Sequence, residues 1–95
     1  MKYVTICGIN YTIEEVDDQL DHGRTFGTLC FDQTTIKINK NMDPQIKKET
    51  LCHEIIHGIF GHLGHEDFCR NEQLVQELGN AIAQSFEPKI WESRK

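Results

Sequence analysis

Residues 43–64 read DPQIKKETLCHEIIHGIFGHLG, and this stretch indicates one long helix. Asp43 followed by Pro44 is a common helix start, because the acid can cap free backbone N–H groups and proline fits the first turn. Gly64 can end the helix, so we expect it over residues 44–63. Apolar side chains recur along it at three- and four-residue spacing: Leu51, Cys52, Ile55, Ile56, Ile59 and Leu63. This spacing predicts an amphipathic helix with one face packed on the rest of the fold.

The expected helix contains an H-E-x-x-H sequence, running from His53 to His57. Two histidines four residues apart lie on the same side of a helix, so both imidazoles can reach one zinc ion. Glu54, next to the first histidine, does not ligate in this pattern but can take a proton from a water that the metal activates. We therefore expect His53 and His57 as zinc ligands and Glu54 as the catalytic base.

A zinc site with two histidines needs a third protein ligand. An extended motif, H-x-x-G-x-x-H, does not fit, because Phe60 and Leu63 stand where its glycine and third histidine should be. The other arrangement takes a glutamate from the following helix, where Glu72 and Glu77 are the candidates.

A second helix is expected over about residues 70–87. Its helical wheel decides between these glutamates. Glu72 falls at the edge of the apolar face, whereas Glu77 points almost directly away from it, so Glu72 is the predicted third ligand. The alternative role for Glu72 is an acid that stabilises a helix N-terminus. The apolar face consists of Val75, Leu78, Ile82 and Phe86.

Other potential ligands are open to two interpretations. His62 and His65 are out of register with the motif; they can be surface histidines, or one can lie near the site and polarise a bound carbonyl. The four cysteines include no C-x-x-C pair, so we expect free thiols, with a disulfide or a metal ligand as the alternative. They are Cys7, Cys30, Cys52 and Cys69.

The first forty residues have the composition of strands. β-branched, aromatic and alternating apolar residues occupy 2–6, 9–16, 27–31 and 35–39, with turn signals at Gly8, Asp21–Gly23 and Asp32–Gln33. Strands followed by helices predict an α+β domain. We expect a small, mainly antiparallel sheet of three or four strands, followed by two main helices at about 44–63 and 70–87 and a tail at 88–95, all in a single domain of residues 1–95.

Charge and hydropathy exclude some functions. The chain has 15 acidic and 10 basic residues and a net charge of -5, which disfavours nucleic-acid binding. No apolar stretch approaches the ~20 residues that span a bilayer. The N-terminal residues show no signal-type segment either. We therefore expect a cytoplasmic protein with no nucleic-acid or membrane partner.

The segment Thr50–Phe60 resembles the motif helix of ImmA/IrrE-type metallopeptidases, in particular short phage and prophage-encoded members. The strand Ile36–Asn39 is also similar, and the resemblance covers about residues 3–86. In the second helix, the matching positions are Glu72, Val75, Leu78, Gly79 and Ile82. The resemblance implies a minimal zincin-like core of the gluzincin type, and larger members of the family cleave repressor proteins.

These observations favour a zinc metallopeptidase of the host-cell cytoplasm that hydrolyses a peptide bond through a zinc-activated water. One zinc ion per chain would be held by His53, His57 and Glu72. The partner would be a peptide or protein such as a repressor or another regulator, paired with an edge strand, for which Thr34–Asn39 is the candidate. The alternative is a non-catalytic, zinc-binding phage accessory protein that binds a host or phage regulator, with Cys69 as a fourth ligand.

Overall fold

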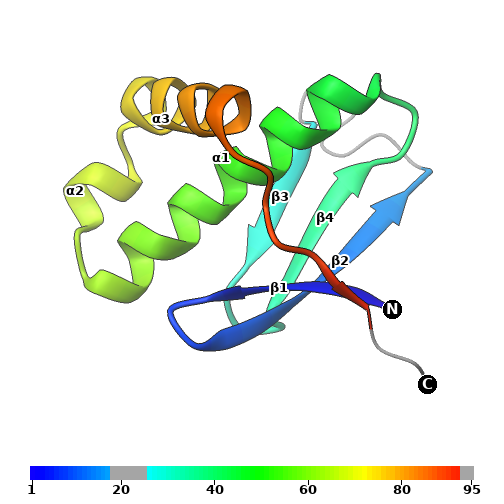
Figure 1. Cartoon of the computed structure of the whole chain (residues 1–95). Helices are drawn as coiled ribbons and strands as arrows, with labels where there is room; N and C mark the ends of the chain where they lie inside the picture. The colour runs from blue at the N-terminus through cyan, green and yellow to red at the C-terminus, as the bar shows by residue number, and fades with distance from the viewer. Residues whose placement is uncertain (18–25, 93–95) are drawn as a thin grey trace.

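The computed structural model describes residues 1–17 and 26–92 (Figure 1). The turn expected at Asp21–Gly23 and the end of the expected tail, residues 93–95, lie outside the described residues. The fold is α+β, as predicted. Its elements are β1 (Lys2–Ile6), β2 (Ile9–Val16), β3 (Gly27–Cys30), β4 (Thr35–Asn39), α1 (Pro44–Leu63), α2 (Glu66–Cys69), α3 (Glu72–Ser85) and β5 (Trp91–Glu92).

The strands form one sheet in the order β3-β4-β2-β1-β5. Only β2 and β4 pair in parallel among the described strands, so the expected mainly antiparallel sheet is confirmed. Cys7 and Gly8 join β1 to β2 with φ angles of 50° and 83°, the positive values of a two-residue hairpin turn. The sheet has five strands rather than three or four, because Trp91 in the expected tail pairs with Tyr3 of β1.

The expectation of an edge strand at Thr34–Asn39 is wrong. β4 lies between β3 and β2 and pairs with both, so its backbone offers no free edge. Its side chains Ile36 and Ile38 are buried in the core. The alternating pattern identified a strand correctly, but such a pattern does not say which strands are its neighbours. The edge strand of this half of the sheet is β3.

Helix α1 connects the sheet to the rest of the molecule. Its first turn is capped by Asp43, whose carboxylate accepts a hydrogen bond of 2.8 Å from the backbone N–H of Gln45. Leu51, Cys52 and Ile56 are buried, whereas Leu63, in the last turn, is exposed. In Figure 1, α1 crosses the sheet, and α3 packs against α1. The core between α1 and the sheet includes Val4, Ile6, Tyr11, Ile36 and Ile38.

The second main helix, α3, begins at Glu72, two residues later than expected. The short helix α2 stands where the sequence indicated a loop, and it is too short to carry a periodic signal. Asn71 then caps α3 by accepting a hydrogen bond of 3.1 Å from the N–H of Leu74. Of the helices described, none is both long enough and apolar enough to cross a membrane.

Gly79 sets the distance between α3 and α1. A Cβ atom at this position would lie 3.0 Å from the Cα and 3.1 Å from the backbone N of His53. Both of these atoms belong to the α1 backbone, which cannot move aside as a side chain can. The absence of a side chain at Gly79 therefore lets α3 approach α1 at the first histidine of the motif.

Candidate metal centre

Three side chains from two helices meet beside the contact between α1 and α3. His53 and His57 come from α1, and Glu72 is the first residue of α3. The Nε2 atoms of the two histidines are 3.1 Å apart. The carboxylate of Glu72 reaches both rings, with Oε2 3.3 Å from Nε2 of His53 and Oε1 3.1 Å from Nε2 of His57. All three residues offer ligand atoms within 4.8 Å of one another and could hold a metal ion.

The spacing of these atoms fits a small tetrahedral cation. Ligands about 2.0–2.1 Å from a zinc ion are separated by roughly 3.3 Å at tetrahedral angles. The Nε2–Nε2 distance of 3.1 Å is close to this value, and each Nε2 lies 3.1–3.3 Å from a different oxygen of the Glu72 carboxylate. The histidine side chains are 16% and 15% exposed and that of Glu72 is 71% exposed, so the group opens to solvent on the α3 side.

The environment of His53 favours the neutral imidazole. Burial lowers its pKa, and the neighbouring His57 lowers it further, against opposing contributions from Glu72 and Gln76. A histidine must be neutral to bind a metal through a ring nitrogen, so this environment prepares the ligand. The other ring nitrogen, Nδ1, is buried and has no hydrogen-bond partner within the described ranges.

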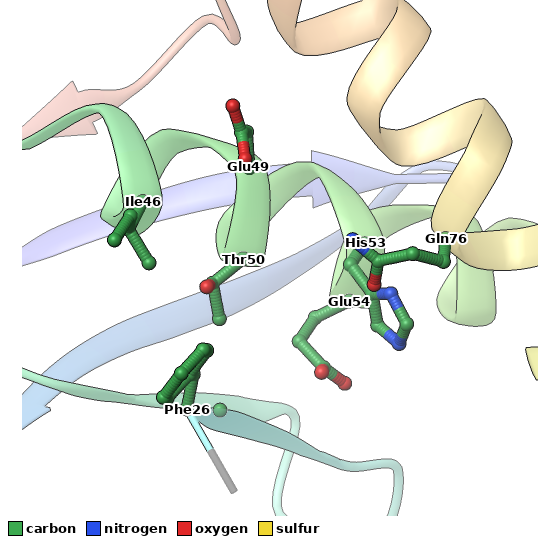
Figure 2. A pocket seen from close by; sticks show the side chains of 8 residues that line it. Phe26, Ile46, Glu49, Thr50, His53, Glu54 and Gln76 are labelled. Atoms are coloured by element: carbon green, nitrogen blue, oxygen red, sulfur yellow. The ribbon is translucent and has the colours of Figure 1, made fainter.

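Glu54 lies next to this group and is only 7% exposed. Burial, followed by the charge of Glu72, raises its pKa from 4.5 to about 7. Figure 2 shows its side chain below α1, beside the ring of His53. Its carboxylate lines a cavity together with His53, His57, Glu72 and residues of β3. The site therefore combines a candidate cation centre with a carboxyl group that titrates near neutral pH.

Gly27 brings the edge strand β3 close to α1. A Cβ at this position would lie 2.7 Å from Cγ2 of Thr50 and 3.7 Å from Cγ of Glu54. A larger residue would push β3 away from the helix. Because β3 starts here, its residues form one wall of the cavity that contains Glu54.

The structure separates the two candidate glutamates. Glu72 touches both histidines, whereas Glu77 is exposed and accepts a hydrogen bond of 3.4 Å from Gln73 on the same helix. The helical wheel predicted these positions of the two side chains, because the buried residues Val75 and Gly79 fix which face of α3 lies against α1.

Cys69 approaches His57 from the other side of its ring. Its Sγ lies 3.7 Å from Nδ1 and 3.5 Å from the backbone oxygen of His57, whereas Nε2 is the atom that faces Glu72. All four cysteines are free, as expected.

Two other histidines, His62 and His65, fall within residues 26–92 of the structure, and both contact aromatic residues. The hydroxyl of Tyr11 is 2.6 Å from Nε2 of His62, and His65 lies against the ring of Phe68. Both histidines are exposed, as the surface interpretation expects, and neither belongs to the group of described residues that could hold a metal.

Sequence reasoning missed Gln76, which lies beside His53 (Figure 2). The sequence could have identified Gln76 by its position four residues after Glu72, which places both side chains on the same face of the helix.

Comparison with known proteins identifies one family. The family model of the IrrE N-terminal-like domain, Peptidase_M78, matches residues 6–86. This range includes His53, Glu54, His57 and Glu72. No curated protein and no solved structure matches the chain.

Proposed function

The chain belongs to the IrrE N-terminal-like peptidase family, and from this membership and its candidate metal centre we propose that it is a zinc-dependent metallopeptidase. One observation carries the proposal: His53, His57 and Glu72 meet next to the buried carboxyl group of Glu54. A cation centre with an adjacent base is the arrangement that hydrolysis of a peptide bond requires.

In this proposal each residue has a separate role. His53 and His57 hold one zinc ion through Nε2, and Glu72 holds it through its carboxylate. The bound zinc supplies a Lewis acid that polarises a carbonyl group and makes water more acidic. Glu54 takes the proton from the attacking water and passes it to the leaving amine. In the metal-free chain, burial and the charge of Glu72 raise the pKa of Glu54 to about 7, and the positive charge of a bound zinc ion would favour the ionised form that accepts a proton.

We propose that the substrate is an extended segment of a protein, such as a repressor or another regulator, in the host-cell cytoplasm. β3 is an edge strand among the described residues, and such an edge could pair with an extended peptide. Gly27, Thr28 and Leu29 of this strand line the same cavity as Glu54 and His57. A peptide added to β3 would therefore lie beside the cavity that Glu54 and His57 line.

The alternative, a closed structural zinc site, needs a fourth protein ligand. Cys69 is the candidate, but its sulfur lies on the Nδ1 side of His57 while Glu72 contacts the Nε2 side. His57 and Cys69 therefore do not face a common point. This arrangement supports a metal centre with one position left for water and substrate.

A cleavage assay tests the proposal. The zinc-loaded protein is incubated with a library of proteome-derived peptides, and new termini are identified by mass spectrometry. Glu54→Gln should retain zinc but lose cleavage by ~100-fold or more, the usual contribution of a general base. The matched control Glu77→Gln, on the exposed face of α3, should cleave normally. Equal cleavage by Glu54→Gln would contradict the assigned role, and no cleavage by zinc-loaded wild type would favour the non-catalytic alternative.

A further inference from the structure

The Nδ1 atom of His53 lacks a hydrogen-bond partner, although it is buried. If His53 binds zinc through Nε2, the neutral ring carries its proton on Nδ1, which is then a donor. Metal-binding histidines nearly always donate this second N–H to an oxygen atom, and the bond fixes the orientation of the ring. A zinc-loaded His53 therefore requires an acceptor close to Nδ1.

Gln76 is in the right place to provide one. It lies four residues after Glu72 on α3, so both side chains project from the same face of the helix, towards α1. Gln76 lines one cavity together with His53, and Figure 2 shows its amide group next to the imidazole ring. The close approach of the two helices at Gly79, one turn further along, holds this part of α3 against the backbone of His53.

The amide group of Gln76 is also oriented for this task. Its Nε2 donates a hydrogen bond of 3.0 Å to Oδ1 of Asn80, which occupies the donor end of the amide. The amide oxygen is then left to accept from another group. Leu74 and Val75 do not offer an acceptor in their side chains, and Glu72 is used by the Nε2 atoms of both histidines.

We propose that Gln76 is a positioning residue that accepts a hydrogen bond from the Nδ1–H of His53 and aims Nε2 of that ring at the zinc ion. This inference rests on the proposed zinc site and extends it: α3 supplies a ligand, Glu72, and the residue that orients another ligand.

Zinc affinity, measured by competition with a chelating dye, tests this role. Gln76→Leu removes the acceptor while keeping a similar volume, and we expect its zinc dissociation constant to rise 10- to 100-fold. Gln76→Glu keeps an acceptor at the same place and should bind at least as tightly as wild type. Gln73→Leu makes the same change on the exposed face of α3 and should bind zinc like wild type. The melting temperatures of the four metal-free proteins should be alike, since Gln76 acts only on the ligand.

A second readout separates positioning from general stability. In the zinc-loaded wild type, the Nδ1 proton of His53 should give a slowly exchanging NMR signal, which Gln76→Leu should lose. The inference is overturned if Gln76→Leu binds zinc as tightly as wild type, if Gln76→Glu is as weak as Gln76→Leu, or if Gln73→Leu loses as much. His53→Ala distinguishes failure of the zinc site from failure of the role of Gln76. If His53→Ala binds zinc as tightly as wild type, the proposed zinc site is wrong. If His53→Ala weakens zinc binding but Gln76→Leu does not, only the positioning role of Gln76 is wrong.

Discussion

Glu54 occupies a position where negative charge is unfavourable. Its side chain is buried beside β3, and the negative charge of Glu72 acts on it. Both influences raise its pKa to about 7, which means that the folded chain prefers the protonated form. A bound cation would offset this cost, because its charge would face both carboxylates. The ionised form of Glu54 therefore destabilises the metal-free protein.

The raised pKa of Glu54 predicts a pH dependence of stability in the metal-free protein. The pKa of Glu54 is about 7 in the folded chain and near 4.5 when unfolded, so the unfolded chain releases this proton first as pH rises. The free energy of unfolding therefore falls as pH rises from about 4.5, where the unfolded chain begins to release the proton, to about 7, where the folded chain does so. Urea unfolding in the presence of a chelator should show wild type losing about 2 kcal/mol relative to Glu54→Gln between pH 5 and pH 8. Parallel pH profiles would show that Glu54 is not perturbed.

Among the elements, α1 could be predicted from the sequence, whereas α2, β5 and the pairing of β4 could not. Asp43, Pro44 and Gly64 mark its ends in the sequence, and the structure has it over Pro44–Leu63. The motif then specifies which residues share its polar face. Helix α2 has four residues and β5 two, which is too few for periodicity to reveal them. The neighbours of β4 depend on how distant strands pair, and local alternation carries no information about that.

The site was predictable for the same reason that α1 was. His53, Glu54 and His57 lie on one helix, so their arrangement follows from helical geometry. Glu72 could be chosen over Glu77 because α3 has a clear apolar face. Gln76 was missed, since its proposed role depends on which atom of His53 is left without a partner, and this is known only once the two helices are packed.

The close contact between α1 and α3 predicts the effect of a substitution at Gly79. Alanine usually stabilises a helix relative to glycine by ~1 kcal/mol. At Gly79, however, the added Cβ would press on the backbone of His53, 3.0 Å away. Gly79→Ala should therefore destabilise the protein by about 1–3 kcal/mol in urea unfolding and weaken zinc binding. The control Gln73→Ala, on the exposed face of the same helix, should leave both unchanged. A more stable Gly79→Ala protein would mean that the helices are not in close contact.

In the whole molecule, a zinc ion would join two layers. α1 packs against the sheet, while α3 packs against α1 and α2. The ligand set takes two residues from α1 and one from α3, so a bound ion would link the outer helix to the central one. A domain of this size buries a limited core, and such a link adds substantially to its stability.

Metal removal should therefore lower the melting temperature. Zinc at 100 times its dissociation constant stabilises a folded protein by ~2.7 kcal/mol, which corresponds to roughly 10 °C or more for a domain of this length. Calorimetry with zinc and with chelator should show this shift in wild type and in Glu77→Ala. Glu72→Ala should lose most of it, because the link to α3 is broken. A full zinc-dependent shift in Glu72→Ala would remove that residue from the ligand set.

The central claim is that His53, His57 and Glu72 hold zinc in a site open to substrate, and X-ray absorption at the zinc edge tests it most directly. Imidazole and carboxylate ligands place nitrogen and oxygen about 2.0–2.1 Å from zinc, whereas a thiolate places sulfur at about 2.3 Å. The account predicts one zinc ion per chain, two imidazole ligands, and only nitrogen and oxygen neighbours. A sulfur neighbour would contradict it, because Cys69 would then close the site as a structural centre.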